Sequence, residues 1–391
     1  DGLLKPEVNT KAVEDVAIDI TNGSSHFSRT ELLRRVAEKY QATGIGISAI
    51  ISAVDHALTE SQELVALATQ RGEDRYTTKE MLGIERELLN SIERASGARK
   101  PLSIHAVNGA ISKCATLSPQ QRDAVIHLTR TNDRVSCVNG MAGTGKTFML
   151  GVARETFENA GFRVLGTTLA AKASETLEEG SGIKSIHIHR LLKQIENGNE
   201  KIDRNTVLVV DEAGMIGTRM MQQLVALTEQ SGAKLILVGD PKQLQAIDAG
   251  GPFAAICRRL GAASLTDITR QRDKWARDAV MEMALGDADR SLSRFAEKGL
   301  LTVSEDRRTA MESLVSVWAS DQDRARSLIF AGTRLETTVL NRLCQEKRLA
   351  AGEIAGESLE VNGSSFYVGD RVTFTQNGGK CASSLILATG Y

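Results

Sequence analysis

The chain has 391 residues, of which 41% are hydrophobic and 25% are charged, and its formal net charge is −1 at pH 7. This composition is ordinary for a globular protein of two or three domains, and it excludes a uniformly basic nucleic-acid-binding chain. No apolar run approaches the length that spans a membrane, and no signal peptide opens the chain, so we expect a cytoplasmic protein. Because residue 1 is Asp rather than Met, we expect a fragment or a processed piece.

The cysteines and histidines do not form a metal-binding pattern. The five cysteines are scattered, without a C-x-x-C pair or a histidine at ligand spacing, so we expect inert thiols. His187 and His189 alternate at a strand end or in a loop. Two histidines without a third ligand are more often surface or core polar groups than a zinc site.

Residues 1–114 are expected to form a helical N-terminal segment without a catalytic signature. Ser28-Arg-Thr-Glu31 and Thr77-Thr-Lys-Glu80 match the capping box that starts a helix, and apolar residues at helical spacing follow each. Ile45–Leu58 is a third segment with helical periodicity. Ser96–Pro101 has the composition of a linker.

From Leu117 the pattern changes to short apolar strands that alternate with helices, as in a doubly wound parallel α/β sheet. The expected strands are Val135–Val138, Arg163–Gly166, Val207–Val210, Lys234–Val238 and Leu328–Ala331. Three of them run directly into polar clusters that begin at Gly140, Asp211 and Gly239. Ligands of such sheets bind at the carboxyl ends of the strands, so these clusters predict an active-site crevice.

Gly140–Thr147 fits G-x-x-x-x-G-K-[ST], the Walker A loop, between an apolar strand and a helix-like run. Its curled backbone and the dipole of the following helix would hold phosphate groups. Lys146 is expected to reach the β- and γ-phosphates of ATP, and the Thr147 hydroxyl is expected to coordinate Mg²⁺. The other loop residues expected to bind the nucleotide are Gly140, Ala142, Gly143, Thr144 and Gly145.

Four further side chains complete the predicted ATP site. Asp211 and Glu212 follow the apolar run Val207–Val210, so Asp211 can hold Mg²⁺ through water and Glu212 can orient the attacking water as catalytic base. The Gln243 amide can accept a hydrogen bond from that water and donate one to the γ-phosphate. Gln121 lies in a helix that starts at Pro119, and its amide could pair with the adenine edge.

These motifs stand in the order of the superfamily 1 helicase motifs. Several longer segments resemble the helicase part of conjugative relaxase-helicases: Gly166–Glu175, Asp211–Thr218, Gly239–Ile247 and Arg270–Ala279. The resemblance covers roughly residues 115–375 and continues more weakly toward the N-terminus.

The resemblance implies RecA-like P-loop NTPase motor domains, the first over residues 115–266 and the second over residues 267–391, preceded by the helical segment. It further implies an ATP-dependent, Mg²⁺-requiring DNA helicase that moves 5′ to 3′ on single-stranded DNA in conjugative transfer. Arg270 would contact the γ-phosphate from the second domain. Lys172 and His189 fall in segments that contact the DNA strand in similar enzymes.

Some parts of the family pattern are absent. The later helicase motifs, one of which brings a second arginine, are not found, and the resemblance stops after Asn377, so we expect a truncated second domain. Phe366–Val372 resembles the strand that leads into a small inserted β-barrel. The metal-binding histidines and the tyrosine of a relaxase are absent too, so a relaxase domain is expected as a partner within a longer polypeptide.

Three alternatives remain. A repair helicase of the exodeoxyribonuclease V alpha-subunit type is disfavoured by the match over Trp275–Ala279 and by the N-terminal segment. A non-catalytic, vestigial ATP-binding domain is disfavoured because Lys146, Asp211, Glu212 and Gln243 are all present. A P-loop kinase is a more distant alternative, because adjacent Asp and Glu side chains suit attack by water.

Overall fold

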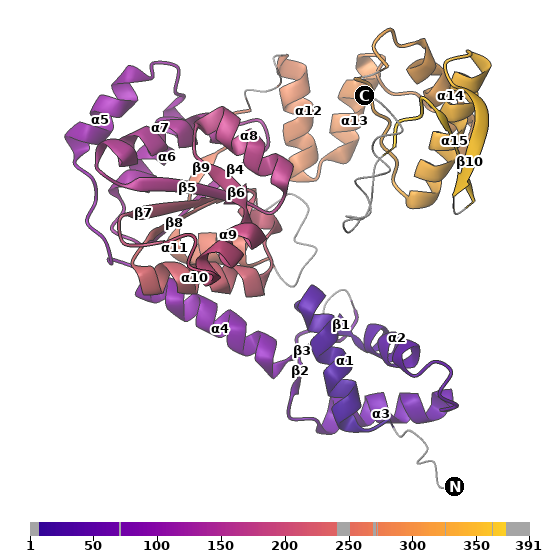
Figure 1. Cartoon of the computed structure of the whole chain (residues 1–391), viewed down its shortest axis with the longest axis horizontal. Helices are drawn as coiled ribbons and strands as arrows, with labels where there is room; N and C mark the ends of the chain where they lie inside the picture. The colour runs from indigo at the N-terminus through magenta and orange to yellow at the C-terminus, as the bar shows by residue number, and fades with distance from the viewer. Residues whose placement is uncertain are drawn as a thin grey trace. The chain divides into compact units, whose positions relative to one another are not determined.

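The computed structural model describes residues 8–69, 72–240, 251–268, 271, 273–324, 326–361 and 363–372 (Figure 1). The chain divides into two units between Asp278 and Ala279. The domain boundaries expected from the sequence, after residues 114 and 266, stay predictions. None of the described helices is both long and apolar enough to cross a bilayer.

Residues 8–78, called the N-terminal module below, contain three helices and a small antiparallel sheet. The elements are α1 (Thr10–Gly23), β1 (Phe27–Ser28), α2 (Arg29–Lys39), α3 (Ile47–Glu60), β2 (Leu64–Ala66) and β3 (Arg75–Thr78). The sheet order is β1-β3-β2. One apolar core joins all three helices and includes Val13, Phe27, Leu32 and Val54. The predicted Ile45–Leu58 helix is confirmed as α3, two residues later at each end.

One of the two predicted helix starts is correct and the other is shifted by one residue. Ser28 caps α2, and its hydroxyl accepts a hydrogen bond from Glu31 N at 3.2 Å. Thr78, rather than Thr77, caps α4 (Lys79–Arg94) by accepting from Met81 N at 3.2 Å. Thr77 pairs with Val65 in the sheet, so the helix cannot begin until the strand has ended.

Helix α4 connects the N-terminal module to the large sheet, where it packs against α10 (Thr218–Ser231). An ion pair lies toward each end of α4. Arg219 Nη1 lies 2.7 Å from Glu80 Oε1, and Arg94 Nε lies 2.7 Å from Glu229 Oε1. Exposed ion pairs stabilise little by themselves, so the packing of apolar residues such as Leu88 and Ile92 against the core holds α4 in place.

The large sheet has six parallel strands in the order β6-β5-β7-β8-β4-β9. They are β4 (Val135–Gly140), β5 (Arg163–Thr168), β6 (Ser185–His187), β7 (Thr206–Val210), β8 (Lys234–Gly239) and β9 (Ala263–Leu265). The four strands predicted in this region are confirmed, together with the doubly wound parallel sheet. Two short strands, β6 and β9, were not predicted.

Helices cover both faces of this sheet (Figure 1). One face packs against α5 (Ile104–Lys113), α6 (Pro119–Arg130), α7 (Lys146–Asn159) and α8 (Ala171–Ser181). The other packs against α4, α9 (Ile188–Glu196), α10 and α11 (Pro252–Leu260). Within β7, Val207 and Val209 point to the first face, and Leu208 and Val210 point to the second. A central parallel strand therefore reads as a continuous apolar run, because both of its faces are buried.

The second unit consists mainly of helices. It contains most of α12 (Lys274–Leu285), followed by α13 (Ala288–Glu297), α14 (Arg307–Ser320), α15 (Arg334–Ala350) and the antiparallel hairpin β10 (Ala355–Val361) and β11 (Ser364–Val368). The strand predicted over Leu328–Ala331 is wrong. No described strand pairs with this segment, and Leu328 and Phe330 are 81% and 87% exposed. An apolar run forms a strand only where a neighbour satisfies its backbone groups.

Lys234, at the start of β8, is a buried cation with only 3% of its surface exposed. Its Nζ donates to Asp133 O at 2.9 Å and to Ser136 Oγ at 2.8 Å. Burial lowers the pKa of Lys234 to about 7, and the nearby charge of Arg99 contributes to the decrease. The folded state therefore disfavours the charged form.

We expect this lysine to make stability rise with pH. Below pH 7 Lys234 is charged in both the folded and the unfolded state, so the folded state bears the full cost of burying the charge. Between pH 7 and 10.5 the lysine is protonated only in the unfolded chain, so this cost disappears. The free energy of unfolding should increase over this window by on the order of 3 kcal/mol more in the wild type than in Lys234→Met. Urea denaturation across the window measures the difference, with Lys113→Met on the exposed face of α5 as control. Parallel curves for wild type and Lys234→Met contradict the assignment.

Candidate nucleotide-binding site

The predicted site residues that the structure describes lie at one edge of the large sheet. Because all six strands are parallel, their carboxyl ends lie at the same edge. The Walker A loop follows β4, Asp211 and Glu212 follow β7, and Asp240 follows β8. Strand β8 lies between β4 and β7, so the loop and the two carboxylates flank it.

The Walker A loop leaves β4 at Gly140 and enters α7 at Lys146. Gly143 and Gly145 have φ angles of 80° and 78°, in the left-handed region that favours glycine. Thr144 Oγ1 donates to Met141 O at 2.8 Å, which holds the turn closed. The side chain at position 144 thus stabilises the loop, while the backbone remains the part suited to phosphate groups.

Lys146 folds back over the loop in this structure. Its Nζ donates to Gly140 O at 2.8 Å. A Cβ at position 140 would lie 2.8 Å from Lys146 Cγ and Cδ, so a side chain there would force Lys146 to move. Gly140 therefore leaves the space in which the Lys146 side chain crosses the loop. A bound phosphate would take the place of one hydrogen-bond partner of the ammonium group, the Gly140 carbonyl.

Thr147 is held by a close contact with α8. A Cβ on Gly180 would lie 2.7 Å from the Thr147 methyl carbon, so a side chain at that helix position would force Thr147 to move. The Thr147 methyl group therefore lies on the side of α7 that faces α8. Sequence reasoning missed Gly180, because a glycine within a helix carries no local signal of a neighbour.

Gln121 is buried, with 5% exposure, and its amide already bonds two groups of the chain. Its Oε1 accepts from Ser118 N at 3.0 Å as part of a capping box, and its Nε2 donates to Thr144 O at 3.0 Å. An adenine contact would require these bonds to be exchanged. The role in adenine recognition stays a prediction, and the structure adds a direct tie between α6 and the Walker A loop.

The neighbouring Gln120 was missed by sequence reasoning. Its Oε1 accepts from Thr266 N at 2.7 Å and Asp267 N at 3.2 Å, just beyond β9. The adjacent glutamines thus attach α6 to the end of β9 on one side and to the Walker A loop on the other. The sequence feature that could have indicated this role is the pair of adjacent glutamines at the start of α6.

Asp211 follows β7 as a buried carboxylate with 9% exposure. Its Oδ1 accepts from Glu212 N at 2.9 Å. Burial raises the pKa of the Asp211 carboxyl to about 6, and the negative charge of Glu212 also raises it. The hydrogen bond from the Glu212 backbone N–H and the positive charge of Lys146 lower it. A carboxylate that has lost most of its water is stabilised by a cation, so this group is chemically suited to hold a divalent metal ion.

Mg²⁺ is compatible with the residues present, which supply one carboxylate oxygen from Asp211 and one hydroxyl from Thr147. No cluster of three or more His, Cys, Asp or Glu able to hold a metal occurs in the described part of the chain. Such a cluster is not needed, because Mg²⁺ in nucleotide sites takes most of its ligands from phosphates and water.

Glu212 has a backbone conformation that is rare for a residue with a side chain. Its φ angle is 55°, in the left-handed region. The turn that follows it packs closely against the end of β8. A Cβ on Gly214 would lie 2.8 Å from Asp240 O, and a Cβ on Gly239 would lie 2.8 Å from Gly214 N. The two glycines bring the turn after Asp211 against β8 and thereby hold Glu212 at the sheet edge.

The remaining predicted residues are only partly within the described structure. Gln243 and Arg270 lie outside the described residues. Lys172 stands near the start of α8, where it is 82% exposed and pairs with Glu175 at 2.9 Å. His189 is exposed on α9, and its ring stacks on that of His187 with centroids 5.2 Å apart. Both helices follow strands of the same sheet, so both residues lie beyond its carboxyl edge.

Several known proteins are similar in sequence to more than half of this chain. A family model described as an AAA domain matches residues 116–306. The probable conjugal transfer protein TraA of Sinorhizobium fredii is 36% identical over 328 residues, which are 81% of this chain and 29% of that protein. The multifunctional conjugation protein TraI of Escherichia coli is 27% identical over 68% of this chain and 16% of its own length.

A third relative is the ATP-dependent RecD2 DNA helicase of Deinococcus radiodurans, which is 27% identical over 55% of this chain and 30% of its own length. The chain therefore spans less than a third of each of these relatives. A match over 81% of the chain includes its middle, so the similarity to TraA extends over the Walker A loop and the carboxylates after β7. By these similarities the chain is a TraA- and TraI-like protein.

Proposed function

We propose that this chain is the ATP-hydrolysing part of a DNA helicase that moves 5′ to 3′ on single-stranded DNA during conjugative transfer. The observation that carries the proposal is the meeting of Lys146 with Asp211 and Glu212 at one edge of a parallel sheet. The relatives support it, since one is an ATP-dependent DNA helicase and two are conjugation proteins by name.

The chain's own groups divide the work of hydrolysis. The Walker A backbone and the Lys146 ammonium group bind the β- and γ-phosphates, and Lys146 exchanges its bond to Gly140 O for one to phosphate. Asp211 and the Thr147 hydroxyl hold the metal, which neutralises phosphate charge when bound. Glu212 aligns the attacking water with the γ-phosphorus and accepts its proton. Gln243 and Arg270 are proposed to sense and contact the γ-phosphate.

The DNA strand is proposed to cross the carboxyl edge of the sheet near α8 and α9. Lys172 offers an exposed ammonium group for a phosphate, and the stacked rings of His187 and His189 offer a flat surface for a base. Since the chain spans less than a third of these TraA and TraI proteins, strand separation and any relaxase domain belong to the longer polypeptide in this proposal.

A non-catalytic ATP-binding domain is the second candidate, and the bonds that Gln121 and Lys146 make within the chain favour it. These bonds hold the loop by contacts within the chain, and a scaffold that only binds ATP needs no catalytic group beyond them. The two candidates differ in one measurable property, which is phosphate release from ATP.

Removing the Lys146 ammonium group should weaken nucleotide binding. Lys146→Ala eliminates a charge-assisted hydrogen bond to phosphate, so the affinity for a fluorescent ATP analogue should fall by about 10- to 100-fold. Fluorescence titration with Mg²⁺ present measures the change, and Lys113→Ala on α5 serves as a control that removes the same charge. Equal affinities of Lys146→Ala and the wild type contradict the Walker A assignment.

Replacing the Glu212 carboxylate should separate binding from hydrolysis. Glu212→Gln keeps the shape of the side chain but removes the base, so the ATPase rate should fall by about 10²- to 10⁴-fold while analogue binding is retained. A phosphate-release assay gives the rate. If the wild type itself releases no phosphate in the presence of single-stranded DNA, the non-catalytic candidate is correct for this chain.

Single-stranded DNA binding should depend on the carboxyl edge of the sheet. The double variant Lys172→Ala, His189→Ala should bind a labelled single strand more weakly. Its slope of log affinity against log salt should be shallower by about 0.7, because one lysine no longer pairs with a phosphate. Lys201→Ala, before the amino end of β7, removes a charge at the opposite edge and should have no effect. Fluorescence anisotropy at several salt concentrations tests this, and an unchanged double variant refutes the proposed path.

A further inference from the structure

The N-terminal module has the topology of a winged helix-turn-helix domain. Its chain order is helix, strand, helix, helix, strand, strand, and β3 lies between β1 and β2 in the sheet. Helices α1, α2 and α3 share one core. Residues 40–46 join α2 to α3 in a turn where Ala42 and Gly44 have φ angles of 65° and 79°. In this arrangement α3 is the helix that enters a DNA groove, and the hairpin β2–β3 is the wing.

The outer face of α3 is suited to a groove because it is small, polar and electrically neutral. Ile50, Val54 and Ala57 bury the inner face. The outer stripe consists of the exposed residues Ser48, Ser52, His56 and Thr59. This composition leaves room for close approach to base edges and offers hydroxyl and imidazole groups for hydrogen bonds.

One acid, Asp55, also lies on this outer stripe, and its charge is paired. Arg29 donates from Nε to Asp55 Oδ1 at 2.6 Å and from Nη2 to Oδ2 at 2.9 Å. The Arg29 guanidinium holds the pKa of the Asp55 carboxyl below its usual range. The stripe therefore presents no unpaired negative charge to an approaching phosphate backbone until Glu60, at the end of the helix.

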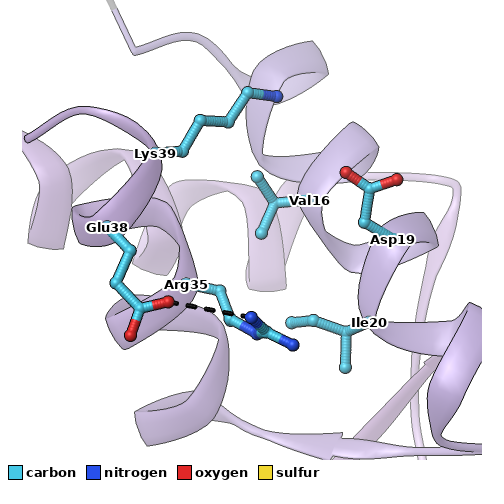
Figure 2. Close-up of a pocket in the computed structure, with 6 residues that line it drawn as sticks. All are labelled: Val16, Asp19, Ile20, Arg35, Glu38 and Lys39. Atoms are coloured by element: carbon cyan, nitrogen blue, oxygen red, sulfur yellow. Dashed lines mark ion pairs between the residues drawn. The ribbon is translucent and has the colours of Figure 1, made fainter. Parts of the chain in front are cut away.

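Helix α2 carries cations where the first helix of a helix-turn-helix crosses the DNA backbone. Arg34, Arg35 and Lys39 are all exposed. Arg35 makes only a long ion pair with Glu38, at 3.8 Å, and within the described ranges neither Arg34 nor Lys39 has an ion pair. Figure 2 shows Arg35 and Lys39 beside a pocket of about 390 Å³ between α1 and α2, whose lining also includes Asp19 and Glu38.

The charge of the module is unevenly distributed. Acids concentrate on α1, at the end of α3 and on the wing: Glu14, Asp15, Asp19, Glu60, Glu63, Glu73 and Asp74. Between Leu32 and Val54 the chain has three cations, Arg34, Arg35 and Lys39, and one acid, Glu38, so this stretch has a net charge of +2. A polyanion would therefore be attracted to the α2 side and repelled elsewhere, which orients the module on it.

We propose that the N-terminal module binds double-stranded DNA, with α3 in the major groove and Arg34, Arg35 and Lys39 on the flanking phosphates. This site is separate from the ATP site and does not rest on ATP hydrolysis. Helix α4 follows the wing directly and packs on α10, which begins six residues after Glu212. Duplex bound by the module is thus tied through α4 to the same unit that contains the Walker A loop.

The test uses the whole chain and two fluorescent probes of equal length, a blunt duplex and a single strand. The triple variant Arg34→Ala, Arg35→Ala, Lys39→Ala should bind duplex at least about 10-fold more weakly, and its slope of log affinity against log salt should be shallower by about 2 to 3. The variant Arg308→Ala, Arg326→Ala, Arg342→Ala removes the same charge from exposed positions in the second unit and should bind duplex normally.

A second variant tests the groove contact itself. Ser52→Glu places a carboxylate in the middle of the α3 stripe, at an exposed helical position that tolerates it, and should abolish duplex binding. Circular dichroism and the fluorescent ATP analogue check that both variants are folded. Single-strand affinity should be unchanged in both.

Three results overturn the proposal. Duplex affinity that is unchanged in the triple variant and in Ser52→Glu shows that the module does not bind duplex. An equal decrease in affinity for duplex and single strand shows that the cations of α2 belong to a general strand-binding surface. If duplex binding is unaffected while sedimentation shows that self-association is abolished, the face binds a second copy of the chain rather than DNA.

Discussion

The pairing of β8 with β4 on one side and with β7 on the other is the constraint on which the candidate site depends. This pairing places the Walker A loop on one side of β8 and Asp211 on the other. The two are close enough for the charge of Lys146 to lower the pKa of the Asp211 carboxyl, which burial raises. Both faces of β7 and β8 are covered by apolar residues, so neither strand can shift without exposing core. The fixed strand ends thereby hold in place the Walker A loop and Asp211, which follow them directly.

Glycine contacts refine this arrangement. Gly140 leaves space for Lys146, Gly180 for the Thr147 methyl, and Gly214 with Gly239 for the turn that carries Glu212. The first two contacts are with side chains and the last two are with backbone, so a methyl group at any of these positions would displace a predicted site residue or the turn that carries Glu212. Gln120 and Gln121 complete the set by attaching α6 to β9 and to the Walker A loop.

The N-terminal module gives the chain a second surface with a different character. Its core is separate from the two cores of the sheet, and α4 is the element that joins them. The carboxyl edge of the large sheet offers an exposed lysine and stacked histidine rings, whereas the module offers a neutral helix face beside three cations. These chemistries suit a flexible single strand and a regular duplex, respectively, and both can coexist in a chain with a net charge of −1.

Local patterns in the sequence determined the Walker A loop, the strands β4, β5, β7 and β8, the cap at Ser28 and the start of α6 at Pro119, because each depends on neighbours within a few residues. Tertiary structure alone decided that Thr78 caps α4, that Leu328–Ala331 forms no strand, and that Gln121 bonds Thr144. It also decided the order of the strands and the winged helix topology. Hydrogen-bond partners distant in the chain settle these features, and no local periodicity encodes a distant partner.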